Sequence, residues 1–93
     1  MNYEAIGRYT TAKEQLHAAC KTRNSALFAL KRWAETASNS DQLVALDSSI
    51  GTQLLRDALR ANEEFDAAVI AANSVADAAE RSLIEVRAGH FTR

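Results

Sequence analysis

The sequence predicts an all-α protein in which two long helices pack antiparallel as a coiled-coil-like hairpin. The 93 residues include no proline and three glycines, so the residues that most often interrupt helices are scarce. Two long stretches repeat apolar residues at alternating intervals of four and three, which places those residues on one side of a helix. A short polar run separates the two stretches, and helices joined by a short connection pack antiparallel.

The first stretch predicts a helix over residues 3–37 with one largely apolar stripe. Arg23 is the only strongly polar member of this stripe. Thr11 and Glu14 have the spacing of a capping box, which allows a break near residues 7–10. We expect no break, because the stripe continues through this point in phase. The members of the stripe are Ala5, Tyr9, Ala12, Leu16, Ala19, Arg23, Ala26, Leu30, Trp33 and Ala37.

The second stretch predicts a longer helix over residues 50–88. Its stripe keeps the same spacing for more than four heptads, as a coiled coil does. Gly89 fits a helix C-cap, so residues 89–93 are expected to form a tail. No stretch alternates apolar and polar residues with period two, so we expect no strand. The members of this stripe are Leu54, Ala58, Ala61, Phe65, Ala68, Ala72, Val75, Ala79, Ser82 and Val86.

Small polar residues mark the connection between the helices. Residues 38–41 read Ser-Asn-Ser-Asp, and such side chains compete for backbone hydrogen bonds and favour a turn. A second polar run follows, in which Ser48 or Ser49 could cap a new helix and Gly51 would weaken a continuous one. Residues 41–47 are therefore expected to form either a short separate helix or a kinked first turn.

Composition predicts one small soluble domain over residues 1–93. The chain is 47% hydrophobic and 25% charged, with a formal net charge of −1, so it resembles neither a disordered chain nor a basic nucleic-acid binder. One cysteine, Cys20, cannot form an internal disulfide, which favours the cytoplasm. The longest apolar run, residues 67–72, is far shorter than the roughly 20 residues of a membrane span. We therefore expect no membrane association, and nucleic acid is the least favoured partner.

Energetics predict that the hairpin associates with itself. Alanine-rich stripes bury little area, and a two-helix hairpin of this size is marginally stable alone. The second helix also carries apolar residues beside and beyond its stripe, over more surface than one partner helix covers. We expect a homo-oligomeric bundle. In the alternative, residues 41–46 or the N-terminus fold back as a third helix and cover this face.

No pattern for catalysis or metal binding stands out. His17 and Cys20 share a helix face with Glu14, but a tetrahedral metal site needs three or four ligands. Glu14 and His17 also have the Glu-x-x-His spacing of di-iron bundles, but Leu16 holds the stripe position instead. The chain contains no glycine-rich phosphate loop and no Gly-x-Ser-x-Gly nucleophile motif. We expect a non-enzymatic protein with no catalytic residues, no metal and no cofactor.

Arg23 is a candidate for an interhelical ion pair. A cation on a coiled-coil stripe needs a partner and can fix the register of the helices. A tight turn brings Arg23 opposite Asp57, whereas a wider turn that reaches Ser49 brings it nearer Glu64. We expect a pair with one of these carboxylates, within one chain or between chains, and the alternative is an arginine that extends to solvent at the edge of the stripe.

The candidate partner-binding residues are apolar side chains outside the stripes. Phe28 lies among cations on the outer side of the first helix, a composition typical of protein-binding hot spots. The neighbouring Lys21, Lys31 and Arg32 could hold an anionic ligand. The remaining candidates lie on the second helix. The full candidate set for partner binding is Phe28, Leu59, Val69, Ile70, Leu83 and Ile84.

These features predict a small helical interaction protein. Its partners would be a second copy of itself and one target protein, as an assembly or adaptor element or as an inhibitor that docks helical faces. The alternative function is binding of a small anionic ligand or nucleotide in a crevice between protomers.

Overall fold

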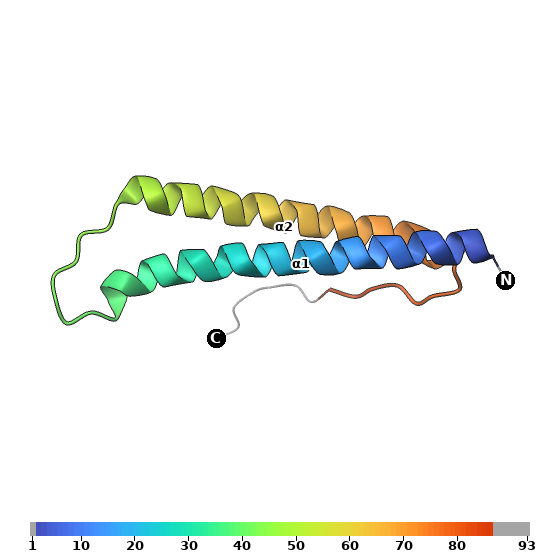
Figure 1. Ribbon diagram of the computed structural model, residues 1–93, viewed down its shortest axis with the longest axis horizontal. Coiled ribbons are helices and arrows are strands. Elements are labelled where there is room, and N and C mark those ends of the chain that lie inside the picture. The colour runs from blue at the N-terminus through green and yellow to red at the C-terminus, as the bar shows by residue number, and fades with distance from the viewer. Residues whose placement is uncertain (1, 87–93) are drawn as a thin grey trace.

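The computed structural model describes residues 2–86, which form two antiparallel helices joined by a loop (Figure 1). Helix α1 spans Tyr3–Ser38 and helix α2 spans Ser48–Ala76. The molecule is elongated, with extents of 63 × 29 × 16 Å. The predicted all-α hairpin is confirmed, and residues 2–86 contain no strand. The predicted Gly89 cap and tail lie outside the described residues.

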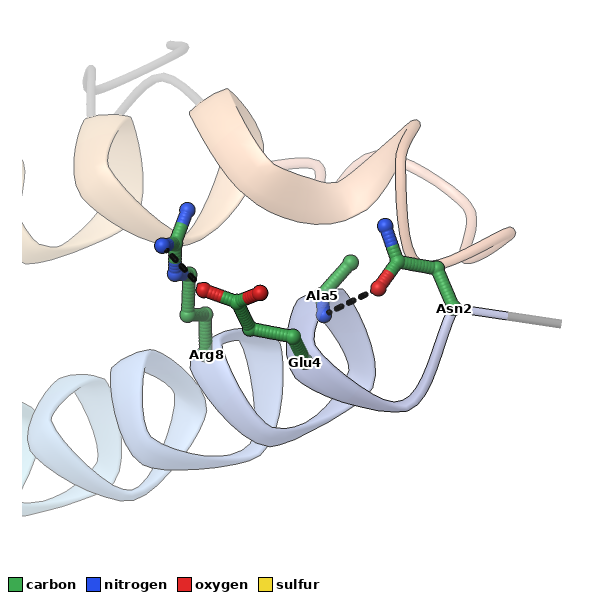
Figure 2. Close-up of polar contacts among 4 residues, drawn as sticks. All are labelled: Asn2, Glu4, Ala5 and Arg8. Carbon is green, nitrogen blue, oxygen red and sulfur yellow. Dashed lines mark hydrogen bonds and ion pairs between the residues drawn. The ribbon is translucent and has the colours of Figure 1, made fainter.

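Helix α1 begins at a side-chain cap and continues without interruption. The Asn2 side-chain oxygen accepts a hydrogen bond from the Ala5 N–H at 3.1 Å (Figure 2), which satisfies one of the free N–H groups of the first turn. Glu4 lies in that turn and pairs with Arg8 at 2.6 Å. The helix passes through residues 7–10, so the capping-box spacing of Thr11 and Glu14 does not mark a start.

The connection between the helices is a loop over residues 39–47 that contains no helix. The short helix considered over residues 41–47 is therefore wrong. Leu43 is fully exposed, whereas Val44 and Leu46 are only partly exposed, so this segment presents no common apolar face that would favour a helix. The cap of α2 is Asp47 rather than Ser48 or Ser49, because its carboxylate accepts the Ser49 N–H at 2.9 Å and the Ser49 hydroxyl at 2.6 Å. Both hydrogen bonds lower the pKa of the Asp47 carboxyl group, and the bond from the Ser49 hydroxyl has the larger effect.

The two predicted stripes form the contact between the helices. Every member from Ala5 to Ala37 in α1 and from Leu54 to Ala79 on the α2 side is buried or half-buried. Most of the fully buried members are alanines. Tyr9, Leu16 and Phe65 are the large side chains among the buried residues. Small side chains let the helix axes approach closely, but they bury little apolar area.

Near the loop, α1 and α2 approach each other closely at Gly51 of α2 and Trp33 of α1. A Cβ atom at this position would overlap the six-membered ring of the Trp33 indole. Gly51 is therefore required by packing, and the indole lies directly on the α2 backbone. Gly51 was expected to weaken a continuous helix, and in the structure it lies inside the first turn of α2.

Helix α2 ends at Ala76 and not near residue 88 as predicted. The Arg81 N–H bonds to the Ala76 carbonyl at 2.9 Å and the Glu80 N–H to the Asp77 carbonyl at 3.0 Å, the pattern of a Schellman motif. Glu80 occupies its left-handed position with φ 57°, where glycine is preferred. The cause lies in tertiary packing. Ala76 and Ala79 already pack against the first turns of α1, so a longer helix would leave Ser82 and Val86 without a partner helix.

The two described glycines predict opposite effects of the same substitution. Gly7 is exposed in mid-helix with nothing near its Cβ position, so Gly7→Ala should raise the free energy of unfolding by about 0.5–1 kcal/mol through helix propensity. Gly51→Ala should lower it by about 1–3 kcal/mol, because the methyl group overpacks against Trp33.

Denaturant unfolding measures both effects, and the fluorescence of the single tryptophan reports displacement of Trp33 in Gly51→Ala. A stabilising Gly51→Ala with unchanged emission would contradict the close packing.

Candidate functional site

A groove between the helices holds the end of the described chain. Residues 81–86, here named the C-terminal strap, turn back after α2 and run alongside the hairpin (Figure 1). The strap and both helices line a cavity of about 510 Å³. Its lining residues are Lys13, Leu16, His17 and Cys20 from α1, Phe65 and Val69 from α2, and Ile84, Glu85 and Val86 from the strap.

Asn73 holds the strap by its backbone. The Ile84 N–H donates to the Asn73 side-chain oxygen at 2.7 Å, and the Asn73 side-chain nitrogen donates to the Ile84 carbonyl at 3.1 Å. This two-point contact resembles one rung of a β-ladder and recognises an extended backbone rather than a particular side chain. Ile84 is half-buried at this point, whereas its neighbours Leu83 and Glu85 are exposed.

A second apolar surface lies on the outer part of α2. Leu55, Leu59 and Ile70 are 47%, 56% and 70% exposed; these three residues are named the α2 apolar flank. With Ala58 at heptad position a, Leu55 and Leu59 fall on the strap side of the helix and Ile70 on the side opposite α1. Leu55 borders a hollow that Leu30 and Trp33 of α1 also line, and Ile70 is the most exposed of the three.

The hairpin exposes more surface than a compact monomer does. Its accessible surface is 7468 Å², against about 5,300 Å² expected for a compact monomer of the same mass. Its radius of gyration is 18.0 Å, against about 12 Å for a compact domain of this length. Apolar side chains of both helices and the loop contribute to this excess. Part of the apolar surface of the described residues is thus exposed to solvent.

The predicted partner-binding residues fall on several surfaces. Val69 and Ile84 both line the strap cavity and are half-buried there. Leu59 and Ile70 belong to the α2 apolar flank, and Leu83 is exposed on the strap. Phe28 is exposed on the outer side of α1, at the edge of a shallow hollow shared with His17, Cys20 and Lys21.

Arg23 contacts an aromatic ring in place of the predicted carboxylates. Its guanidinium lies 4.1 Å from the centroid of the Phe65 ring, a cation–π arrangement, and also bonds the Asn24 side-chain oxygen at 3.2 Å. The wider of the two turns brings α2 residues near Phe65, rather than Asp57, opposite Arg23. Within residues 2–86, Arg23 forms no ion pair with Asp57 or Glu64. The predicted pair is therefore wrong within one chain, and a pair between chains stays a prediction.

The three cations proposed for an anionic ligand do not converge. Lys31 pairs with Glu35 at 3.6 Å. The Arg32 guanidinium lies 5.8 Å from the Phe28 ring centroid, and Lys21 lines the hollow beside Phe28. Because Lys31 is engaged with a carboxylate and sits about one quarter turn away from the other two around the helix, one chain offers no common site for a phosphate group.

The described residues offer no metal cluster. Across residues 2–86, no three His, Cys, Asp or Glu side chains gather closely enough to hold a metal ion. Cys20 is free and half-buried, and it lines the strap cavity together with His17. None of the helices in the described part of the chain has the length and apolarity to cross a membrane.

No family model, curated protein or solved structure matches this chain. The fold and its exposed surfaces define the class, a two-helix hairpin with an apolar flank and a strapped groove.

The strap and its anchor were missed by the sequence analysis. In the sequence, Asn73 is a polar residue that interrupts the apolar surface of the second helix. A signal was present, because an asparagine flanked by Val69, Ala72 and Ala76 has a side chain that can satisfy a backbone N–H and C=O together. Its partner could not be identified, since residues 77–86 have strong helix-forming composition.

The Arg23–Phe65 contact predicts an energetic coupling. A double-mutant cycle of Arg23→Gln with Phe65→Leu should give a coupling of about 0.5–1 kcal/mol, the range for a partly exposed cation–π pair. The matched cycle of Arg23→Gln with Asp57→Asn should give a coupling near zero. Denaturant unfolding measures both, and a larger coupling to Asp57 would restore the ion-pair interpretation.

Proposed function

We propose that this protein is a non-enzymatic helical interaction module that assembles with a second copy of itself through the α2 apolar flank. The observation that carries the proposal is the exposure of Leu55, Leu59 and Ile70 along one helix. Three large aliphatic side chains exposed on one helix give a partner helix an apolar surface to pack against.

The weak internal core supports this proposal. The residues buried between α1 and α2 are mainly alanine, so the hairpin gains little hydrophobic free energy from its own contact. Association through the flank adds the burial of leucine and isoleucine side chains that one chain leaves in water. The resulting assembly would be a bundle of four or more helices with coiled-coil packing.

The charge distribution is compatible with this arrangement. Residues 1–37 hold six basic and three acidic residues, whereas residues 38–93 hold five basic and nine acidic ones. Helices of opposite net charge attract each other within a hairpin and also between hairpins. A cytoplasmic setting belongs to the same proposal, since the free Cys20 fits a reducing compartment.

Light scattering coupled to size exclusion tests the proposal. The unsubstituted protein should elute as a multimer, and the double variant Leu59→Glu with Ile70→Glu should weaken association by about 100-fold or more, because two apolar contacts are lost and two charges would be buried. The variant should still form helix at low temperature, since neither side chain packs in the α1–α2 contact, but its thermal midpoint should fall because the stabilisation by association is lost.

The matched control is Leu43→Glu, the same change at a fully exposed loop residue. It should leave the molar mass unchanged. A monomeric unsubstituted protein, or a multimer that the flank variant does not alter, would contradict assembly through the flank.

A further inference from the structure

The C-terminal strap is attached to the hairpin by few interactions. Its polar anchor is the pair of hydrogen bonds between Asn73 and the Ile84 backbone. Ile84 is its one half-buried residue, and residues 81–83, 85 and 86 are exposed. Local openings of so small a contact cost far less than global unfolding. The groove beneath the strap is therefore accessible to another chain when the strap detaches.

The turn before the strap is under backbone strain. Glu80 takes the left-handed position of the Schellman motif without being glycine, which costs on the order of tenfold in the population of this turn. Residues 77–86 also continue the heptad stripe of α2 in phase through Ala79, Ser82 and Val86. Residues 77–80 are therefore strained in the turn and can also continue α2 as helix. Such a segment is a hinge suited to the exchange of a segment between chains.

We propose that the groove is a docking site for the C-terminal strap of a second copy of this chain. In the exchanged form, residues 77–80 continue α2 as helix and carry the strap out of its own groove. The strap of each chain then occupies the groove of the other and makes the same contacts there.

The lining of the groove fits this occupant. The Asn73 amide pairs with an extended backbone. The apolar side chains of Phe65 and Val69 line the same cavity as the strap's Ile84 and Val86. Lys13 borders the same cavity as the strap's Glu85, so these two charges complement each other. Since the occupant within one chain already demonstrates the fit, exchange replaces each contact by an equivalent one.

Strap exchange rests on the proposed function in one respect, which is that two copies of the chain must come into contact. Exchange uses the groove, whereas assembly in the proposed function uses the α2 apolar flank, so the two can fail separately. Cys20 provides a native reporter, because it lines the groove opposite the strap and is the only cysteine of the chain.

Disulfide trapping tests the exchange. The variant Glu85→Cys is oxidised at increasing protein concentration and separated on a denaturing, non-reducing gel. Exchange predicts a covalent dimer joined through Cys20, whose fraction grows with concentration. The control combines Glu85→Cys with Cys20→Ser, which removes the reporter in the groove and should lose this dimer. An internal disulfide in a monomer at every concentration would overturn the proposal.

Two further variants test the groove and the hinge. Asn73→Ala should remove the covalent dimer, and a dimer that persists would show that the strap does not dock in the groove. Glu80→Gly relieves the left-handed strain and disfavours a continued helix, so its dimer fraction should be about tenfold below that of Glu80→Ala. Equal fractions in the two hinge variants would overturn the hinge mechanism.

The trapping is repeated with Leu59→Glu and Ile70→Glu present. A covalent dimer that survives these changes supports exchange independently of the flank. Loss of the covalent dimer in the presence of these two substitutions would overturn the claim that exchange is independent of the α2 apolar flank.

Discussion

Close approach of α1 and α2 through alanine and glycine governs the rest of this structure. Small side chains such as Ala58, Ala61 and Ala72 are buried at the contact, and at Gly51 the Trp33 indole lies directly on the opposing backbone. This packing is specific in register but low in buried apolar area, because an alanine contributes a single methyl group. Arg23 can occupy the stripe because the Phe65 ring on the opposite helix receives its guanidinium.

A contact made of small residues leaves the large apolar residues without a place inside one chain. Leu55, Leu59 and Ile70 remain on the outside of α2. The C-terminal strap adds a little to the apolar area buried within one chain. It folds back and half-buries Ile84 instead of extending α2 into solvent. Flank association and strap exchange are both ways in which a second chain would supply the burial that one hairpin lacks.

Periodicity predicted the hairpin because residues three and four apart lie on one face of a helix, so the contact between two helices is visible as a local spacing in the sequence. The same local rule extended α2 to residue 88, but a helix also needs something to pack against, and α1 reaches no further than the level of Ala79. Arg23 was assigned to a carboxylate because the sequence does not specify the loop length and hence the register. The role of Asn73 depends on a contact eleven residues away, which no periodic pattern encodes.

The central claim is that the stability of the hairpin depends on association. Thermal unfolding followed by circular dichroism over about a 100-fold range of protein concentration tests it most directly, since association with the native state raises the midpoint by mass action. We expect the midpoint to rise steadily with concentration. A high midpoint that does not change with concentration would contradict the claim and show that one hairpin is sufficient.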